Sequence, residues 1–179
     1  MLASQIKSNE IEFGSCNKDL LEEIIFYGIG LGADFVEIFI ENTDNASVLA
    51  EEDNITNVSP SFGKGAGIRI FKNKRDGFVS TNDLSKHGLM RSVSQAIEML
   101  DITDKKNREV FNGLDKHRDY SLSKKSWINE VPSIQEICQK LLVSTKSLKK
   151  NKKIITRKGS YSRNLQEVII ASSDGTYVS

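Results

Sequence analysis

The sequence has few cysteines and no long apolar run. Cys16 and Cys138 are its only cysteines, they lie far apart, and they form no Cys-x-x-Cys pair, which is typical of proteins in a reducing cytoplasm. The N-terminal segment MLASQIKSNEIEFGS contains no apolar stretch of the kind found in a signal peptide. No apolar run approaches the roughly 20 residues of a membrane span. These absences predict a soluble cytoplasmic protein that does not bind a membrane.

The chain also lacks a strong charge of either sign. Lys and Arg number 25 and Asp and Glu number 24, so the net charge is +1 and gives no general attraction for nucleic acid or anionic lipid. The basic run between Lys146 and Lys158 could still contact nucleic acid, but it has no interleaved aromatic residues. A solvated, basic helix end is the favoured interpretation of this run, and nucleic-acid binding is not expected.

No catalytic or metal-binding motif is visible in the 179 residues: there is no His-Glu helix motif, nucleophile elbow or catalytic triad. His87 and His117 are the only histidines, and neither has a carboxylate or cysteine at metal-ligand spacing. Cys138 lies in an apolar helical pattern, which favours a buried thiol over a nucleophile. The acidic run at residues 51–53 could hold a hard cation, although adjacent carboxylates in a turn are more often solvated. The sequence therefore predicts no catalytic residue, no cofactor-binding residue and no metal ligand within this chain.

The most distinctive segment is residues 59–85, SPSFGKGAGIRIFKNKRDGFVSTNDLS, which has glycines at alternate positions, Gly63, Gly65 and Gly67. A phosphate-binding loop would place such glycines between a strand and the N-terminus of a helix. Here they lead into a strand pattern, and no Gly-Lys-Ser/Thr sequence follows. Nucleotide binding is therefore disfavoured, and we expect a strand bend or the close approach of another backbone at these glycines.

Residues 1–16 show no periodicity and are expected to form a flexible arm. A helix pattern begins after Asn17, the expected N-cap, and the glycines at 28, 30 and 32 would end it. Residues 33–41 alternate as a strand, and one face of this strand is wholly apolar. The residues of that face are Val36, Ile38 and Ile40, and we expect them to pack against the first helix.

Short turns separate the next strand patterns. We expect one turn at residues 42–45, which would make a hairpin, and a second at residues 51–54. Pro60 and Gly63 should interrupt the following strand. A polar turn at residues 72–77, ending in Asp-Gly, would return the chain. The expected strands are residues 47–51, 55–59, 65–71 and 78–81.

Two further helix patterns follow, and each has a cap. Asp83 or Ser85 would begin the second helix, and Ser133 and Glu136 are spaced as the capping box of the third. Between the helices, residues 101–132 are polar and aperiodic, which predicts a linker. The apolar stripe of the second helix comprises Leu89, Val93, Ala96, Ile97 and Leu100, and the expected anchors of the linker are Phe111, Tyr120 or Trp127.

The last segment has a β pattern. Residues 154–162 and 166–173 predict a strand pair, followed by a turn at Asp174-Gly175. The patterns together predict an α+β fold in which about three helices pack on a mainly antiparallel sheet, because the turns are too short for parallel crossovers. We expect a single domain over residues 17–179. Because the chain ends inside a β pattern, we also expect it to be part of a longer protein.

Several of these segments resemble the N-terminal domain of the TldD/PmbA family of metallopeptidases, whose members are also called modulators of DNA gyrase. The family pattern is a GA-D-EV strand, an acidic-turn strand, a G-GVRVF strand and a G-GF-ST-DLS segment before a helix. The matching positions are Gly32-Ala33-Asp34, Glu37, Gly65, Gly67, 68–71, Gly77-Phe78 and 80–85. The segments 117–120 and 160–175 match as well, and the details of residues 48–56 and 80–85 are closer to the TldD branch.

The resemblance implies a function for a longer parent protein. In the TldD branch, a His-Glu-x-x-x-His motif and a further ligand in a C-terminal domain hold the catalytic zinc. This motif is absent here, so no catalytic or zinc-binding residue is carried over, and the catalytic domain would lie outside this chain. By resemblance, the N-terminal domain helps to form a homodimer or a heterodimer with a paralogue and encloses a cleft for unfolded or modified peptides. A sheet edge could accept such a peptide through main-chain pairing.

Three hypotheses remain open. In the first, the chain is the non-catalytic N-terminal domain of a cytoplasmic TldD-like zinc metallopeptidase, which hydrolyses unfolded or modified peptides with a zinc-activated water. In the second, it is a stand-alone peptide-binding or assembly module that resembles the inactive partner of a heterodimer. The third and least favoured is a nucleic-acid-associated regulator of DNA gyrase.

Overall fold

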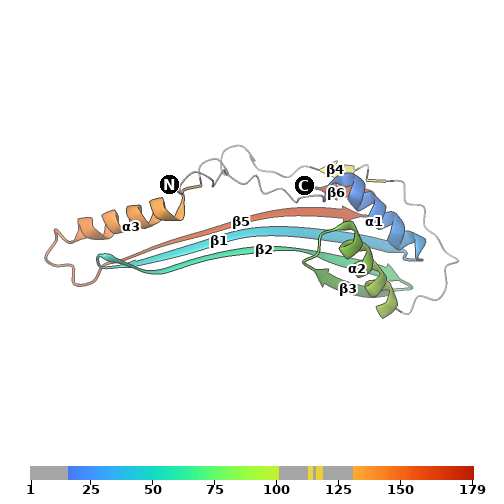
Figure 1. The fold of residues 1–179 in the computed structure, drawn as a ribbon, viewed down its shortest axis with the longest axis horizontal. Helices are drawn as coiled ribbons and strands as arrows, with labels where there is room; N and C mark the ends of the chain where they lie inside the picture. Colours follow the sequence, from blue (N-terminus) through green and yellow to red (C-terminus); the bar gives the residue numbers. More distant parts are fainter. Residues whose placement is uncertain (1–15, 101–112, 115, 119–130) are drawn as a thin grey trace. The chain divides into compact units, whose positions relative to one another are not determined.

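The computed structural model describes residues 16–100, 113–114, 116–118 and 131–179. The elements are, in order, α1 (Lys18–Gly30), β1 (Phe35–Glu51), β2 (Asn54–Lys72), β3 (Arg75–Thr81), α2 (Lys86–Met99), β4 (Lys116–Arg118), α3 (Ile134–Leu148), β5 (Lys158–Ser172) and β6 (Thr176–Val178). The described strands form one sheet in the order β3-β2-β1-β5-β6-β4 (Figure 1). The pairs β2–β3 and β5–β6 are antiparallel, and β4–β6 is parallel. The expected α+β class with a mainly antiparallel sheet is confirmed.

Contacts within the chain divide it into two compact units. Among the described residues, one unit comprises residues 16–42, 64–100, 113–114, 116–118 and 167–179, and we call it the core unit. The other comprises residues 43–63 and 131–166, and we call it the small unit. The expectation of a single domain over residues 17–179 stays a prediction. The expected flexible arm lies almost wholly in residues 1–15, outside the described part of the chain.

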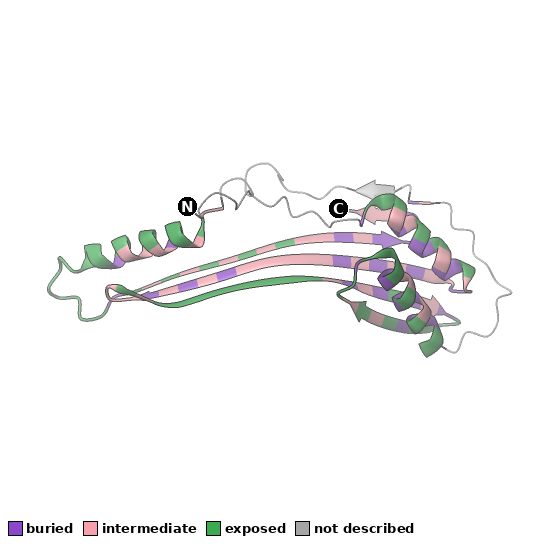
Figure 2. Ribbon diagram, in the orientation of Figure 1, coloured by how far each residue is buried: buried purple, intermediate pink, exposed green. Residues whose placement is uncertain are grey.

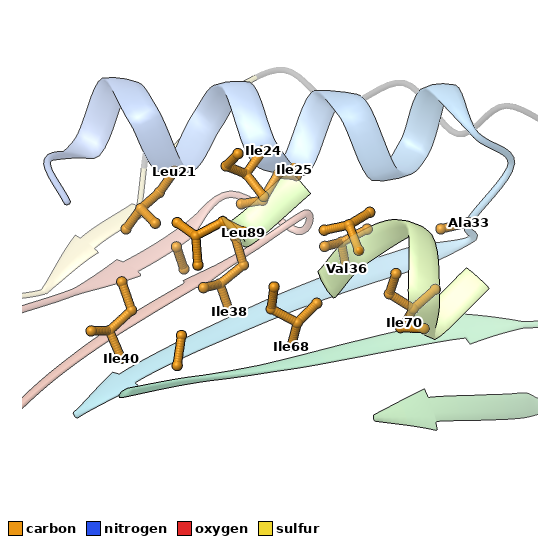
Figure 3. Packing of buried hydrophobic residues seen from close by; sticks show 14 of the residues in the cluster. Leu21, Ile24, Ile25, Ala33, Val36, Ile38, Ile40, Ile68, Ile70 and Leu89 are labelled. Carbon is orange, nitrogen blue, oxygen red and sulfur yellow. The ribbon is translucent and has the colours of Figure 1, made fainter. Parts of the chain in front are cut away.

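In the core unit, α1 and α2 cover one face of the sheet. The buried side chains of Val36, Ile38 and Ile40 point toward α1, as expected from their alternation (Figure 3). α2 packs against both α1 and β3, and its whole expected apolar stripe is buried. One hydrophobic cluster therefore joins both helices to one face of β1 and β2.

The expected helix starts are confirmed by side-chain caps. The Leu20 N–H donates to the Asn17 side chain at 2.9 Å, and the Gly88 N–H donates to Ser85 Oγ at 3.1 Å. Of the two candidates for the start of α2, Ser85 is thus the N-cap. The capping box of Ser133 and Glu136 is complete. Each cap satisfies backbone donors that the first turn of a helix leaves without partners.

The expected turn at residues 42–45 is wrong, and so is the hairpin that it would make, because β1 runs unbroken from Phe35 to Glu51. The buried residues of β1 all have even numbers, both before and after residues 42–45, so the same face of the strand is buried on both sides of them. They are Val36, Ile38, Ile40, Ala46, Val48 and Ala50. Asp44 sits within the strand because Arg163 Nη2 donates to both of its carboxylate oxygens at 2.9 Å. A polar segment with such a partner can remain extended.

Pro60 and Gly63 do not interrupt β2, which is continuous from Asn54 to Lys72. β3 pairs with β2 only between Ala66 and Lys72. Residues 54–65 therefore have no strand on that side within the described part of the chain. A proline is tolerated at such an edge because its missing N–H removes no ladder hydrogen bond.

The expected turn within residues 72–77 is confirmed, but the chain does not reverse at Asp-Gly. The chain turns at Asn73 and Lys74, which have φ values of 51° and 62°, and positive φ at two central residues is typical of a type I′ hairpin turn. Asp76 and Gly77 already belong to β3. The expected strand pair in the last segment is likewise one strand, because β5 runs unbroken from Lys158 to Ser172.

Most of the expected linker at residues 101–132 lies outside the described residues, and so do Phe111, Tyr120 and Trp127. Leu114 is buried in the core unit, and its N–H donates to Glu22 Oε1 at 2.9 Å. The short strand β4 pairs with β6. Part of this segment is therefore built into the sheet. None of the helices that the structure describes is long and apolar enough to cross a membrane.

Candidate functional site

The described residues contain no group of three or more His, Cys, Asp or Glu side chains that could hold a metal ion. His87 is exposed in the first turn of α2. His117 lies in β4, where only the backbone is described. Cys138 is half-buried on α3, whereas Cys16 is buried and its Sγ donates to the Leu84 carbonyl at 3.4 Å. Burial raises the pKa of the Cys16 thiol, which opposes formation of a reactive thiolate.

The acidic turn between β1 and β2 is bound by basic residues of the small unit. Lys158 Nζ lies 2.7 Å from Glu51, and Lys149 Nζ lies 3.0 Å from Asp53. Arg157 binds both Glu52 and Asp53. All three carboxylates, which could have held a cation or been solvated, instead form ion pairs.

Arg157 is the centre of this network, and only 9% of its side chain is exposed. Its Nε donates to Glu52 Oε2 at 2.8 Å, and its Nη1 donates to Asp53 Oδ1 and to the Thr145 carbonyl, each at 3.2 Å. Hydrogen bonds from the Arg157 backbone N–H and then from its guanidinium hold the pKa of Glu52 below its ordinary value. The Lys149 ammonium, followed by Arg157, likewise lowers the pKa of Asp53. The network ties α3 to the turn, which is a structural role.

The basic run that could have contacted nucleic acid is thus partly neutralised. Lys149, Arg157 and Lys158 bind the acidic turn, and Lys146 is exposed in the last turn of α3. A basic residue there interacts favourably with the negative end of the helix dipole. This arrangement agrees with a solvated helix end.

The edge of β2 is a candidate site for an extended ligand. Its residues 56–64 are all exposed (Figure 2). Val58 and Phe62 point to the same face of the strand because they are four residues apart, and Phe62 is 76% exposed. Within the described residues, no strand pairs with this edge. Unpaired main-chain groups beside exposed apolar side chains can accept an added strand.

A second candidate is the face of the core-unit sheet opposite α1 and α2. An open depression on this face is lined by Glu37, Phe39, Gly67, Arg69, Asp76 and Phe78. A Cβ on Gly67 would lie 2.9 Å from the Phe78 ring, and one on Gly65 would lie 3.1 Å from the Thr81 carbonyl. The close backbone approach expected at the glycines thus occurs at Gly65, whereas Gly67 makes room for an aromatic ring.

Sequence reasoning anticipated a sheet edge that accepts a peptide but did not locate it, and it did not find the depression. The edge depends on β3 being shorter than β2, which no local pattern indicates. The depression brings together residues of β1, β2 and β3. The alternation of Phe35, Glu37 and Phe39 in β1 was the one local signal for a partly apolar second face.

One comparison with known proteins identifies a family for part of the chain. Residues 36–100 match the family described as PmbA/TldA metallopeptidase domain 1. No curated protein has a significant sequence match to the chain. The match confirms the resemblance to the TldD/PmbA family, without distinguishing the TldD branch.

Solved structures share the fold. TldE from Thermococcus kodakarensis is 20% identical with a TM-score of 0.69, and the match covers 89% of this chain and 36% of that one. A proposed modulator of DNA gyrase from Bacteroides thetaiotaomicron is 18% identical with a TM-score of 0.64, covering 93% and 38%. Another from Thermotoga maritima is 13% identical with a TM-score of 0.65, covering 89% and 36%. The chain thus spans little more than a third of the length of these structures.

Proposed function

Because residues 36–100 match the first domain of the PmbA/TldA metallopeptidase family, we propose that the chain is the non-catalytic N-terminal domain of a cytoplasmic zinc metallopeptidase. In this proposal it guides unfolded or modified peptides to a catalytic domain and contributes to a homodimer or heterodimer. The observation that carries the proposal is the family match, together with the small share of the matched structures that the chain covers.

The described residues do not fit a zinc site, since they offer no group of three potential ligands. The zinc and its activation of water therefore belong, in this proposal, to the rest of the parent protein. We expect the coding frame to continue past Ser179 and to encode a His-Glu-x-x-x-His motif. A frame that lacks this motif would overturn the assignment to a zinc peptidase.

Peptide guidance is supported by the edge of β2. An extended peptide could pair with main-chain groups along residues 56–64, while its side chains contact Val58 and Phe62. Main-chain pairing needs no particular sequence, which suits a domain that receives unfolded chains. The second hypothesis, a stand-alone peptide-binding module, would use the same edge of β2. It differs from the first because it requires no parent enzyme.

We expect the 179-residue chain to bind a fluorescent, extended peptide, as measured by anisotropy, and Phe62→Lys to weaken the affinity several-fold. A charged side chain on an edge opposes strand addition. Val143→Lys is the matched control, because Val143 is 69% exposed on α3. A peptide with N-methylated amides, which lacks N–H donors, should bind weakly. No binding at high micromolar concentration, or equal effects of the two lysine substitutions, would contradict peptide guidance by this edge.

A further inference from the structure

One cation on the open face of the core-unit sheet is already held between a carboxylate and an aromatic ring. Arg69 Nε and Nη2 donate to Asp76 Oδ2 at 3.1 and 3.0 Å. The guanidinium carbon of Arg69 also lies 4.7 Å from the centre of the Phe71 ring. A cation above an aromatic face is attracted by the ring quadrupole. This face is therefore chemically suited to guanidinium or ammonium groups.

A second carboxylate and further aromatic rings lie beside Arg69, and no cation of the described chain is bound to them. Glu37, Phe39 and Phe78 line the open depression together with Arg69 and Asp76. One arginine between two carboxylates leaves this group of charges at −1. Since Arg69 is bound to Asp76, the Glu37 carboxylate has no ion-pair partner among the residues that the structure describes. Phe78, which also lines the depression, is 57% exposed.

Gly67 keeps the depression open. It lies on β2 between β1 and β3, and any Cβ at this position would lie 2.9 Å from Phe78 Cε2. A larger residue here would therefore fill the part of the depression next to Phe78. The missing side chain gives an incoming group access to the aromatic rings and to Glu37.

We propose that this depression binds the side chain of a lysine or arginine in an extended polypeptide. The positive group would pair with Glu37, and its aliphatic stem would pack on Phe39 and Phe78, since such stems bury readily along apolar surface. A metal ion is a poorer occupant because Glu37 is the one lining carboxylate that Arg69 does not already bind. The inference does not rest on the peptidase assignment or on the edge of β2.

The test compares three peptides of equal length that carry a central lysine, norleucine or glutamate, each titrated against the full 179-residue chain. We expect the lysine peptide to bind most tightly, and its affinity to fall with added salt, as for an exposed ion pair. Glu37→Gln should weaken the lysine peptide about fivefold and leave the norleucine peptide unchanged. Glu98→Gln, at an exposed position on α2, is the matched control and should have no effect.

Phe78→Ala provides a second variant in case Glu37→Gln does not fold. Because Phe78 is largely exposed, this substitution should leave thermal unfolding nearly unchanged and weaken the lysine peptide about fivefold. Equal binding of the lysine and norleucine peptides, or equal effects of Glu37→Gln and Glu98→Gln, would overturn the proposal. Loss of binding in Phe62→Lys with full retention in Glu37→Gln and Phe78→Ala would assign binding to the edge of β2 and would also overturn it.

Discussion

At Gly77, the backbone of α2 lies close against β3. A Cβ at this position would lie 2.5 Å from the Ala96 carbonyl oxygen and 3.2 Å from Leu100 Cγ. The carbonyl belongs to the backbone of α2, so it cannot move aside as a flexible side chain could. The Asp-Gly sequence suggested a turn, but the glycine is required for packing between a helix and a strand.

Gly77→Ala should therefore lower the free energy of unfolding by about 1–3 kcal/mol, the usual cost of overpacking. Denaturant titration followed by circular dichroism would measure the change. Gly30→Ala is the matched control: Gly30 ends α1, and apart from its chain neighbours and the nearby backbone of α1, no described atom lies within 4 Å of its Cβ position. This control should be neutral or stabilising by up to about 1 kcal/mol. Equal stability of the two variants would show that α2 can move away from β3 at little cost.

At the scale of the element, strand faces and helix caps could be predicted, but strand lengths could not. Asn17, Ser85 and Ser133 cap their helices because a cap depends on neighbours within one turn of the chain. The polar residues 42–45 suggested a turn because their composition is typical of turns. However, the buried, apolar residues keep even numbers on both sides of them, with Ile40 before and Ala46 after. This continued alternation predicted the strand better than the local composition predicted a turn.

Other errors depended on pairing partners that no local pattern contains. Pro60 is compatible with β2 because β3 ends its pairing at Ala66. Asp44 stays in a strand because Arg163, distant in the sequence, binds it. The candidate sites could not be located from the sequence for the same reason. An edge and a sheet face exist only once neighbouring strands are known, whereas the family resemblance depended on sequence alone.

The Arg157 network makes the attachment of α3 sensitive to acid. The pKa values of Glu52 and Asp53 lie below their ordinary values of 4.5 and 3.8 in the folded chain. Groups with lowered pKa stabilise the fold at pH values above the unfolded pKa, and this stabilisation is lost as the pH falls through the folded pKa. The contribution should be complete well above pH 4.5 and be lost below pH 3.8.

We therefore expect Arg157→Gln to lower the unfolding midpoint at pH 6 and to differ less from the unsubstituted chain as the pH approaches 3. Arg91→Gln is the control, because Arg91 and Asp83 form an exposed pair at 3.4 Å, and exposed pairs contribute little. Urea titrations at a series of pH values would measure both. A deficit of Arg157→Gln that stays constant across this range would show that the guanidinium acts through packing and not through the carboxylates.

At the scale of the whole molecule, buried apolar side chains are unevenly divided. Every member of the large hydrophobic cluster belongs to the core unit. In the small unit, the described buried hydrophobic residues are Ala46, Val48, Ala50 and Ile137. Its other buried residues include Thr145 and Arg157, which are polar. Because apolar burial is the main stabilising contribution to folding, the small unit should open more readily than the core unit.

The strand β1 provides an internal comparison, since it passes through both units. We expect amides of residues 36–40 to exchange with deuterium at least about tenfold more slowly than those of residues 46–50, a difference of ~1.4 kcal/mol in opening free energy. Both segments lie in the same strand and have the same alternating burial, so local strand structure alone predicts no difference. Hydrogen exchange of both segments would be measured by mass spectrometry. Repeating it at two pH values would show whether the equilibrium of local opening determines the amide exchange rates. Equal protection of the two segments would mean that the chain opens as one cooperative body, in which the ion network around Arg157 stabilises the small unit as effectively as the hydrophobic cluster stabilises the core unit.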